Sequence, residues 1–182
     1  GNIVPYNLAN KAQIQTLIGE LNSASKYPLL IGVDQEGGKV QRLSGKNGFK
    51  NYPTAYSLGK KDDEKLTYQT AKEIAQELKE CGFNLNFAPS VDLHNPKSPA
   101  IGAKERAFHE TALKTYKHAY AYAKAMKKSG IIPTLKHFPG HGNAMSDTHA
   151  GFTDISSHWQ DNELLPYNKF IEKKFDGMIM AA

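Results

Sequence analysis

The hydrophobic positions along the chain alternate between two patterns. Residues 28–33 and the residues from 131 onward form short apolar runs that are typical of buried strands, and residues 1–6, 83–88 and 177–182 also resemble strands. Between these runs, apolar residues recur at the three- and four-residue spacing of amphipathic helices. The helical positions are Ile14, Leu17, Ile18 and Leu21; Leu66, Thr70, Ile74 and Leu78; Ala112, Tyr116, Ala119 and Ala123; and the segment 159–174, which contains Pro166.

Local signals fix two of the helix boundaries. Asn10 stands where an N-cap is expected before the first helix, and Gly82 follows the last periodic residue of the second. The result is a βαβαβαβαβ series with short connections, which predicts parallel strands joined by helical crossovers. We find no internal repeat or linker that would divide residues 1–182, so we expect a single domain.

An open sheet and a closed barrel share this pattern, and periodicity does not distinguish them. The polar residues favour a TIM-type (β/α) barrel, because Asp34, Asp92, Lys136 and His137 all stand at the carboxyl ends of predicted strands and could converge on one mouth. Such a barrel needs about eight strands. The chain supplies roughly the first five, so we expect it to be the N-terminal and central part of one barrel domain, truncated at its C-terminal end.

Composition and charge limit the kinds of partner that we expect. The formal net charge is +5, but most lysines fall in helical segments, where solvated faces account for them, and no zinc-finger spacing or aromatic RNA motif is present. Nucleic acid is therefore not an expected partner.

Cys81 is the single cysteine, and its place in an apolar helix tail predicts a packed, unreactive thiol. The sequence shows no signal peptide or membrane-length apolar run, which favours a cytoplasmic location but leaves secretion or lipid anchoring open while the true N-terminus is unseen.

The strongest concentration of titratable groups follows the central apolar run. In Asp147-Thr148-His149, two residues of an extended segment would point to the same side, so the carboxylate could hydrogen-bond one ring nitrogen and leave the other available. Such a pair can act as a general acid/base. A loop histidine bonded to a turn-forming aspartate is the alternative interpretation.

A second motif, residues 34–42 (DQEGGKVQR), places Asp34 at a strand end before two glycines. A carboxylate there can accept paired hydrogen bonds from vicinal hydroxyls, and Arg42 could return to the same mouth. A turn in which Asp34 caps nearby amides explains the motif equally well.

A metal site is a third interpretation of the polar loop, which contains His137, His141, Asp147 and His149. Pro139 and Gly140 exclude the helical spacing of two histidine ligands, so we place metal behind a sugar-binding acid/base site and a purely structural loop. The other histidines are predicted to be exposed or to cap helices, and they are His94, His109, His118 and His158.

Together these segments resemble glycoside hydrolase family three, and more narrowly its bacterial β-N-acetylglucosaminidase (NagZ-like) branch. The matching motifs are GVDQEGGKVQR at 32–42, NFAPSVD at 86–92, IGAKERAF at 101–108, KHFPGHG at 136–142 and DTH at 147–149. The resemblance covers nearly the whole chain in order. It implies a TIM-type barrel, retaining hydrolysis of terminal β-linked N-acetylglucosamine from cell-wall or chitin-type oligosaccharides, and no metal or other cofactor.

Carried over by position, the family's residues acquire individual roles. Its acid/base histidine falls on His149 with Asp147 as the orienting partner, while the family nucleophile belongs to a later strand-end loop, expected beyond Ala182. The segment 101–108 is longer than the family's usual Ile-Gly-Asp-Arg-Ser-Phe, which puts the position of Arg106 in doubt, and Thr148 replaces the more usual Ser. The implied sugar-binding residues are Asp34, Arg42, Arg106, Lys136 and His137.

Two other functions stay open at this point: a degenerate barrel that binds sugars without cleaving them, and a phosphorylase of the same family. The natural substrate and the oligomeric state are not determined by the sequence.

Overall fold

The computed structural model describes residues 8–146, 151 and 154–181. Its centre is a parallel sheet in the order β1-β4-β5-β6, formed by Gly32–Val33, Leu85–Asn86, Ile132–Phe138 and Met178–Ala181. Each strand pairs in parallel with the next one added to the sheet, and Leu85 is in register with both Gly32 and Ile132. The order never reverses, whereas a doubly wound open sheet has a reversal point. The consecutive order therefore supports the barrel prediction.

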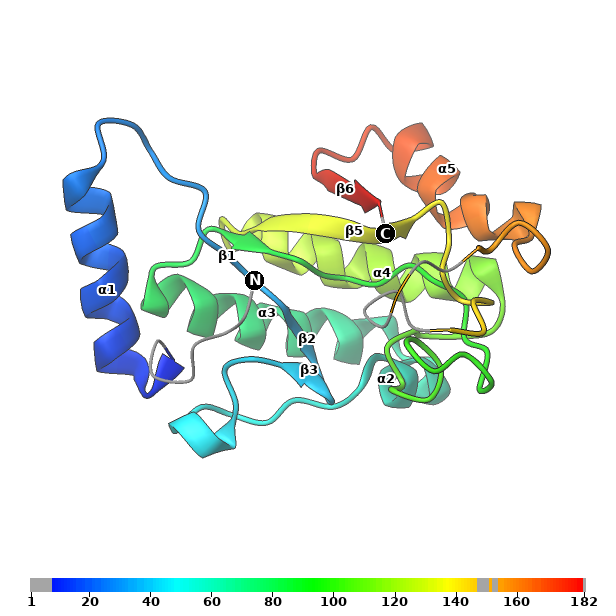
Figure 1. The fold of residues 1–182 in the computed structure, drawn as a ribbon, viewed down its shortest axis with the longest axis horizontal. Helices are drawn as coiled ribbons and strands as arrows, with labels where there is room; N and C mark the ends of the chain where they lie inside the picture. Colours follow the sequence, from blue (N-terminus) through cyan, green and yellow to red (C-terminus); the bar gives the residue numbers. More distant parts are fainter. Residues whose placement is uncertain (1–7, 147–150, 152–153, 182) are drawn as a thin grey trace.

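The helices form the connections between these strands. They are α1 (Lys11–Ala24), α2 (Ala55–Lys61), α3 (Glu64–Cys81), α4 (Ala112–Lys128) and α5 (Leu165–Glu172), with 3-10 turns η2 (Gly45–Asn47) and η4 (Asp161–Leu164). Figure 1 shows α3 and α4 side by side along one face of the sheet. The core lies between them and the strands, and contains Ile74 and Leu78 of α3 with Ala119 and Ala123 of α4.

Several predicted boundaries are confirmed. The Asn10 side chain accepts a hydrogen bond from Gln13 N and caps α1, while Gly82 ends α3 in the left-handed conformation.

Cys81 is buried, and burial raises the pKa of its thiol to about 11, as expected of an unreactive cysteine. In the part of the chain that the structure describes, no helix is long and apolar enough to cross a membrane. The predicted strand at 1–6 lies outside the described residues.

Other elements differ from the prediction. The strands expected at 28–33 and 83–88 are shorter, because regular pairing is confined to Gly32–Val33 and Leu85–Asn86. The helix expected at 159–174 begins later, as α5, and Pro166 sits in its first turn, where a missing N–H costs nothing. His118 is buried, not exposed, because it faces α3 and its Nδ1 lies 2.8 Å from Thr67 Oγ1.

Helix α2 and a hairpin of two strands were not predicted. Helix α2 is short, with three buried residues and no extended apolar stripe, and Thr54 caps it by accepting from Ser57 N. After β1 the chain forms a small antiparallel hairpin of β2 (Gln35–Gly37) and β3 (Val40–Gln41). The bend of this hairpin falls at Gly37 and Gly38, which both have positive φ values, a backbone conformation that glycine adopts readily.

Candidate active site

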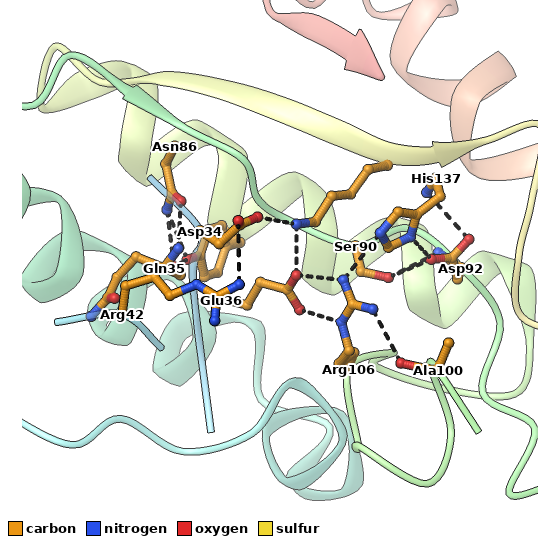
Figure 2. Close-up of polar contacts among 12 residues, drawn as sticks. Asp34, Gln35, Glu36, Arg42, Asn86, Ser90, Asp92, Ala100, Arg106 and His137 are labelled. Atoms are coloured by element: carbon orange, nitrogen blue, oxygen red, sulfur yellow. Dashed lines mark hydrogen bonds and ion pairs between the residues drawn. The ribbon is translucent and has the colours of Figure 1, made fainter. Parts of the chain in front are cut away.

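The site lies where adjacent strands of the sheet end. Asp34 follows β1, while Lys136 lies in β5 on the other side of β4, and β5 continues through His137. Pairing maintains the strand there, since Val91 N donates to Lys136 O at 2.7 Å. The Lys136 ammonium lies 2.9 Å from Asp34 Oδ1 and 2.7 Å from Glu36 Oε1 (Figure 2). Lys136 is buried, and two carboxylates share its charge.

Arg106 extends this network from the loop before α4. Its Nε and Nη2 atoms donate to the two oxygens of Glu36 at 3.0 and 2.8 Å, and Nη1 donates to the carbonyl of Ala100 at 3.1 Å. A two-pronged contact between a guanidinium and a carboxylate fixes both groups in angle as well as distance. Glu36 therefore holds Lys136 on one side and Arg106 on the other.

The contacts of His137 determine its tautomer. Its Nε2 lies 3.0 Å from Arg106 Nη2, and because a guanidinium only donates, Nε2 must accept. The proton is then on Nδ1, which lies 2.6 Å from Asp92 Oδ2. We therefore assign Nδ1 of His137 as the donor to Asp92 and Nε2 as the acceptor from Arg106.

Gln35 explains why Asp34 and Glu36 point in the same direction. In an extended segment alternate side chains point to opposite sides. Gln35 points away from the network into the core, where it exchanges side-chain hydrogen bonds with the backbone of Leu43. Its own backbone pairs with the side chain of Asn86 and accepts from the Tyr122 hydroxyl at 2.8 Å. The two acids flanking Gln35 are thereby turned toward Lys136.

Charges are balanced within the network. Burial would raise the pKa of Glu36, but Lys136 and Arg106 outweigh it and hold that pKa below its ordinary value. The pKa of Asp92 is also lowered, because its contact with His137 and the hydrogen bonds from His141 N and the Ser90 hydroxyl overcome the effect of burial. Lys136, Arg42 and Arg106 likewise lower the pKa of Asp34 against burial. All three carboxylates are therefore ionised at neutral pH.

Exposure varies along the network. Lys136 and Glu36 are buried, whereas the Asp34 side chain is 34% exposed and the Arg42 side chain 42% exposed. Arg42 Nη2 lies 3.7 Å from Asp34 Oδ2, so the two form a loose contact at the open end. A solute reaching the strand ends from solvent would meet the Asp34 carboxylate, supported from behind by Lys136.

A glycine-rich segment, residues 139–146, continues from β5 and is called here the histidine loop. Asp92 accepts from His141 N at 2.8 Å, and Glu163 of η4 accepts from Gly142 N at 3.2 Å. The Trp159 indole also donates to Pro139 O at 3.3 Å. The loop is thus fastened to the segments on both sides of it.

The structure brings the predicted sugar-binding residues together, including Arg106, whose position the longer loop had put in doubt. Two acids in this region were not given a role by the sequence. Glu36 could have been found from the two-residue alternation that starts at Asp34, whereas nothing local marks Glu163. The residues that meet in the network are Asp34, Arg42, Arg106, Lys136 and His137, while Asp147 and His149 lie outside the described residues.

No group of three or more His, Cys, Asp or Glu side chains within residues 8–146, 151 and 154–181 is arranged to hold a metal ion. The predicted metal alternative included two residues outside these ranges, so it is not tested.

The comparisons with known proteins identify the family. Residues 1–182 match the sequence profile of the Glycosyl hydrolase family 3 N terminal domain. The chain belongs to glycoside hydrolase family 3. It is 36% identical to a β-hexosaminidase of Nitrosomonas eutropha, over 97% of this chain and 52% of that protein. It is also 36% identical to β-hexosaminidase A of Pseudoalteromonas piscicida, over 97% of this chain and 31% of that protein.

Solved structures agree with this assignment. A family 3 β-N-acetylglucosaminidase from Paenibacillus superimposes with a TM-score of 0.86 at 35% identity, over 99% of this chain and 35% of that one. NagZ from Neisseria gonorrhoeae in complex with N-trifluoroacetyl-D-glucosamine gives 0.86 at 30% identity, over 99% and 54%. The TIM-type barrel prediction is confirmed, since this is the fold of the family's N-terminal domain. The family 3 chain spans about half or less of the length of these relatives.

Proposed function

We propose that the gene product carrying this family 3 sequence is a retaining glycoside hydrolase that removes terminal β-linked N-acetylglucosamine from cell-wall or chitin-type oligosaccharides. The observation that carries the proposal is the buried network of Lys136, Glu36 and Arg106 that presents Asp34 at the strand ends. The names of the relatives, β-hexosaminidases and β-N-acetylglucosaminidases, support the same activity. We also propose that residues 1–182 form part of a single glycosidase barrel domain.

The chemistry of the network suits sugar hydroxyls. Each hydroxyl can donate one hydrogen bond and accept others, so adjacent acceptors and donors recognise a vicinal pair. Asp34 supplies carboxylate oxygens, and Lys136 uses two of its three N–H groups on Asp34 and Glu36. We propose that the third N–H of Lys136 and the exposed side of Asp34 bind the sugar, with Arg42, Arg106 and His137 completing the binding site.

We assign cleavage to the Asp147–His149 dyad. We propose that His149 protonates the leaving oxygen and then activates water, while Asp147 orients the imidazole and favours its protonated form. Most retaining glycosidases use two carboxyl groups, and the family resemblance accounts for a histidine in one of these roles. The resemblance assigns the aspartate nucleophile to a later strand end.

The test uses the complete gene product and an aryl β-N-acetylglucosaminide. A retaining hydrolase releases N-acetylglucosamine whose first-formed anomer is β, which proton NMR detects before mutarotation. Equal rates in phosphate and non-phosphate buffers are expected, whereas a sugar 1-phosphate formed in phosphate buffer would identify a phosphorylase. Binding of N-acetylglucosamine without turnover of any such substrate would identify a degenerate sugar-binding barrel and contradict the proposal.

A further inference from the structure

Glu163 is a buried acid that none of the steps above uses. It lies in η4, is 1% exposed, and belongs to the segment after the histidine loop. Its Oε2 accepts from Gly142 N at 3.2 Å, and its Oε1 accepts from Asn143 Nδ2 at 3.0 Å and from Gln160 N at 3.2 Å. Two of these three donors belong to the histidine loop.

The histidine loop fits closely between Glu163 and the chain following β4. A Cβ atom added at Gly140, where φ is +144°, would lie 2.6 Å from Glu163 Cβ, and one added at Gly142 would lie 2.2 Å from Leu93 O. On the β4 side, Asn143 Oδ1 accepts from Asn95 Nδ2 at 3.0 Å. Neither glycine has room for a side chain, so the loop backbone can approach both walls closely.

Two buried carboxylates hold consecutive amides of this loop. Asp92 accepts from His141 N at 2.8 Å, and Glu163 accepts from the next amide, Gly142 N, at 3.2 Å. Asp92 also bonds the ring of His137, so the loop is coupled to the sugar-binding network through one residue. Burial raises the pKa of Glu163, and Asp92 raises it further, whereas its hydrogen-bond donors lower it. A buried carboxylate is costly unless it keeps its hydrogen-bond partners, so the contacts of Glu163 favour the loop position in which all three donors reach it.

The histidine loop leads directly in sequence to Asp147 and His149. We propose that Glu163 is a positioning residue for the glycosidase reaction, which fixes the histidine loop beside the sugar-binding network at the point from which the sequence continues to the proposed acid/base dyad. This inference rests on the proposed function. Glu163 acts through Gly142 and Asn143 and does not touch the sugar.

The decisive variant in the complete gene product is Glu163→Gln, which keeps the volume but replaces one acceptor oxygen by an NH2 group. In either orientation the amide faces an N–H of the loop or of Gln160 with a donor, so a buried contact is lost. We expect kcat for a substrate with a poor leaving group, such as an N-acetylglucosamine disaccharide, to fall on the order of tenfold or more. The fall for an activated aryl glycoside should be severalfold smaller, and KM should change less than about twofold, because the binding network is not altered.

A compensating pair adds a readout that a merely structural role would not move. Combining Glu163→Gln with Asn143→Asp exchanges donor and acceptor across one contact, so a substantial part of the lost kcat should return. Asn143→Ala alone removes the loop's own donor and should act in the same direction, which keeps the proposal testable if Glu163→Gln does not fold. The matched control is Glu172→Gln on the exposed surface of α5, where the carboxylate pairs with Lys169 at 2.8 Å. It should leave both substrates unchanged.

The outcomes separate this inference from the proposed function. If the wild-type protein fails to hydrolyse N-acetylglucosaminides, both are overturned together. If the wild type is active, then Glu163→Gln kinetics equal to the wild type, or equal losses on both substrates without recovery in the double variant, would overturn the positioning role and leave the glycosidase assignment standing.

Discussion

Glu36 should contribute more to the free energy of unfolding than Glu73, an acid on the protein surface. It contacts Lys136 at 2.7 Å and Arg106 at 2.8 Å, and all three side chains are at most 9% exposed. At an effective dielectric constant of about 20, unit charges at the Lys136 distance attract by about 6 kcal/mol before the cost of desolvation. Removing one partner of a buried ion pair costs about 3–5 kcal/mol, because the other charge stays buried without compensation.

The perturbation is Glu36→Gln, which preserves size and removes the charge. We expect the free energy of unfolding of the complete protein at pH 7 to fall by about 3–5 kcal/mol, measured by urea unfolding. The control is Glu73→Gln, which breaks an ion pair with Lys50 whose side chains are 38% and 60% exposed. That change should cost about 1 kcal/mol or less.

The pH dependence provides a second check. The folded state lowers the pKa of Glu36 below 4.5, so its contribution is fully present above that pH and is lost as the pH falls through the lower folded pKa. The stability difference between wild type and Glu36→Gln should therefore be constant above pH 4.5 and shrink below it. A loss no larger than that of Glu73→Gln, or a difference that grows on acidification, would refute the buried-network reasoning.

Three further predictions concern the catalytic and binding residues in the complete protein. His149→Ala should reduce kcat much more with a poor leaving group than with an activated aryl glycoside, and Asp147→Ala should do so more weakly; equal losses on both substrates would contradict the acid/base role. Asp34→Ala should weaken N-acetylglucosamine binding in calorimetry by on the order of a few kcal/mol, and unchanged affinity would rule out this strand end as the sugar site. The folded state lowers the pKa of Asp92 below 3.8, so the contribution of Asp92 to stability is lost as the pH falls below that value. Asp92→Asn should therefore flatten the acid limb of the profile of unfolding free energy against pH. An unchanged acid limb would contradict the stabilising role of the Asp92 carboxylate.

Much of the candidate site could be predicted, because polar residues that follow buried parallel strands gather at one edge of the sheet. Parallel strands joined by helices end at one edge, so Asp34 and Lys136, 102 residues apart in sequence, were expected near each other and form an ion pair. The family resemblance added Arg106, although its loop is longer than usual. The role of the Asp147–His149 pair stays a prediction, because it lies outside the described residues.

What the sequence by itself determined is the local framework. Helix caps such as Asn10 and Gly82, and the apolar periodicity of α3 and α4, depend on short-range hydrogen bonding and on burying one face, and both are visible in a window of a few residues. The alternation of strands and helices then set the parallel topology.

Only the tertiary structure decided which charges meet. Glu36 lies 70 residues from Arg106, and Glu163 lies 21 residues from Gly142, so no local pattern pairs them. In the sequence, nothing distinguishes His118 from an exposed polar residue on a helix. In the folded protein, α3 packs against His118 and buries it beside Thr67. A buried charge is stable only with partners, and those partners come from separate segments, so they are fixed when the strands and loops assemble.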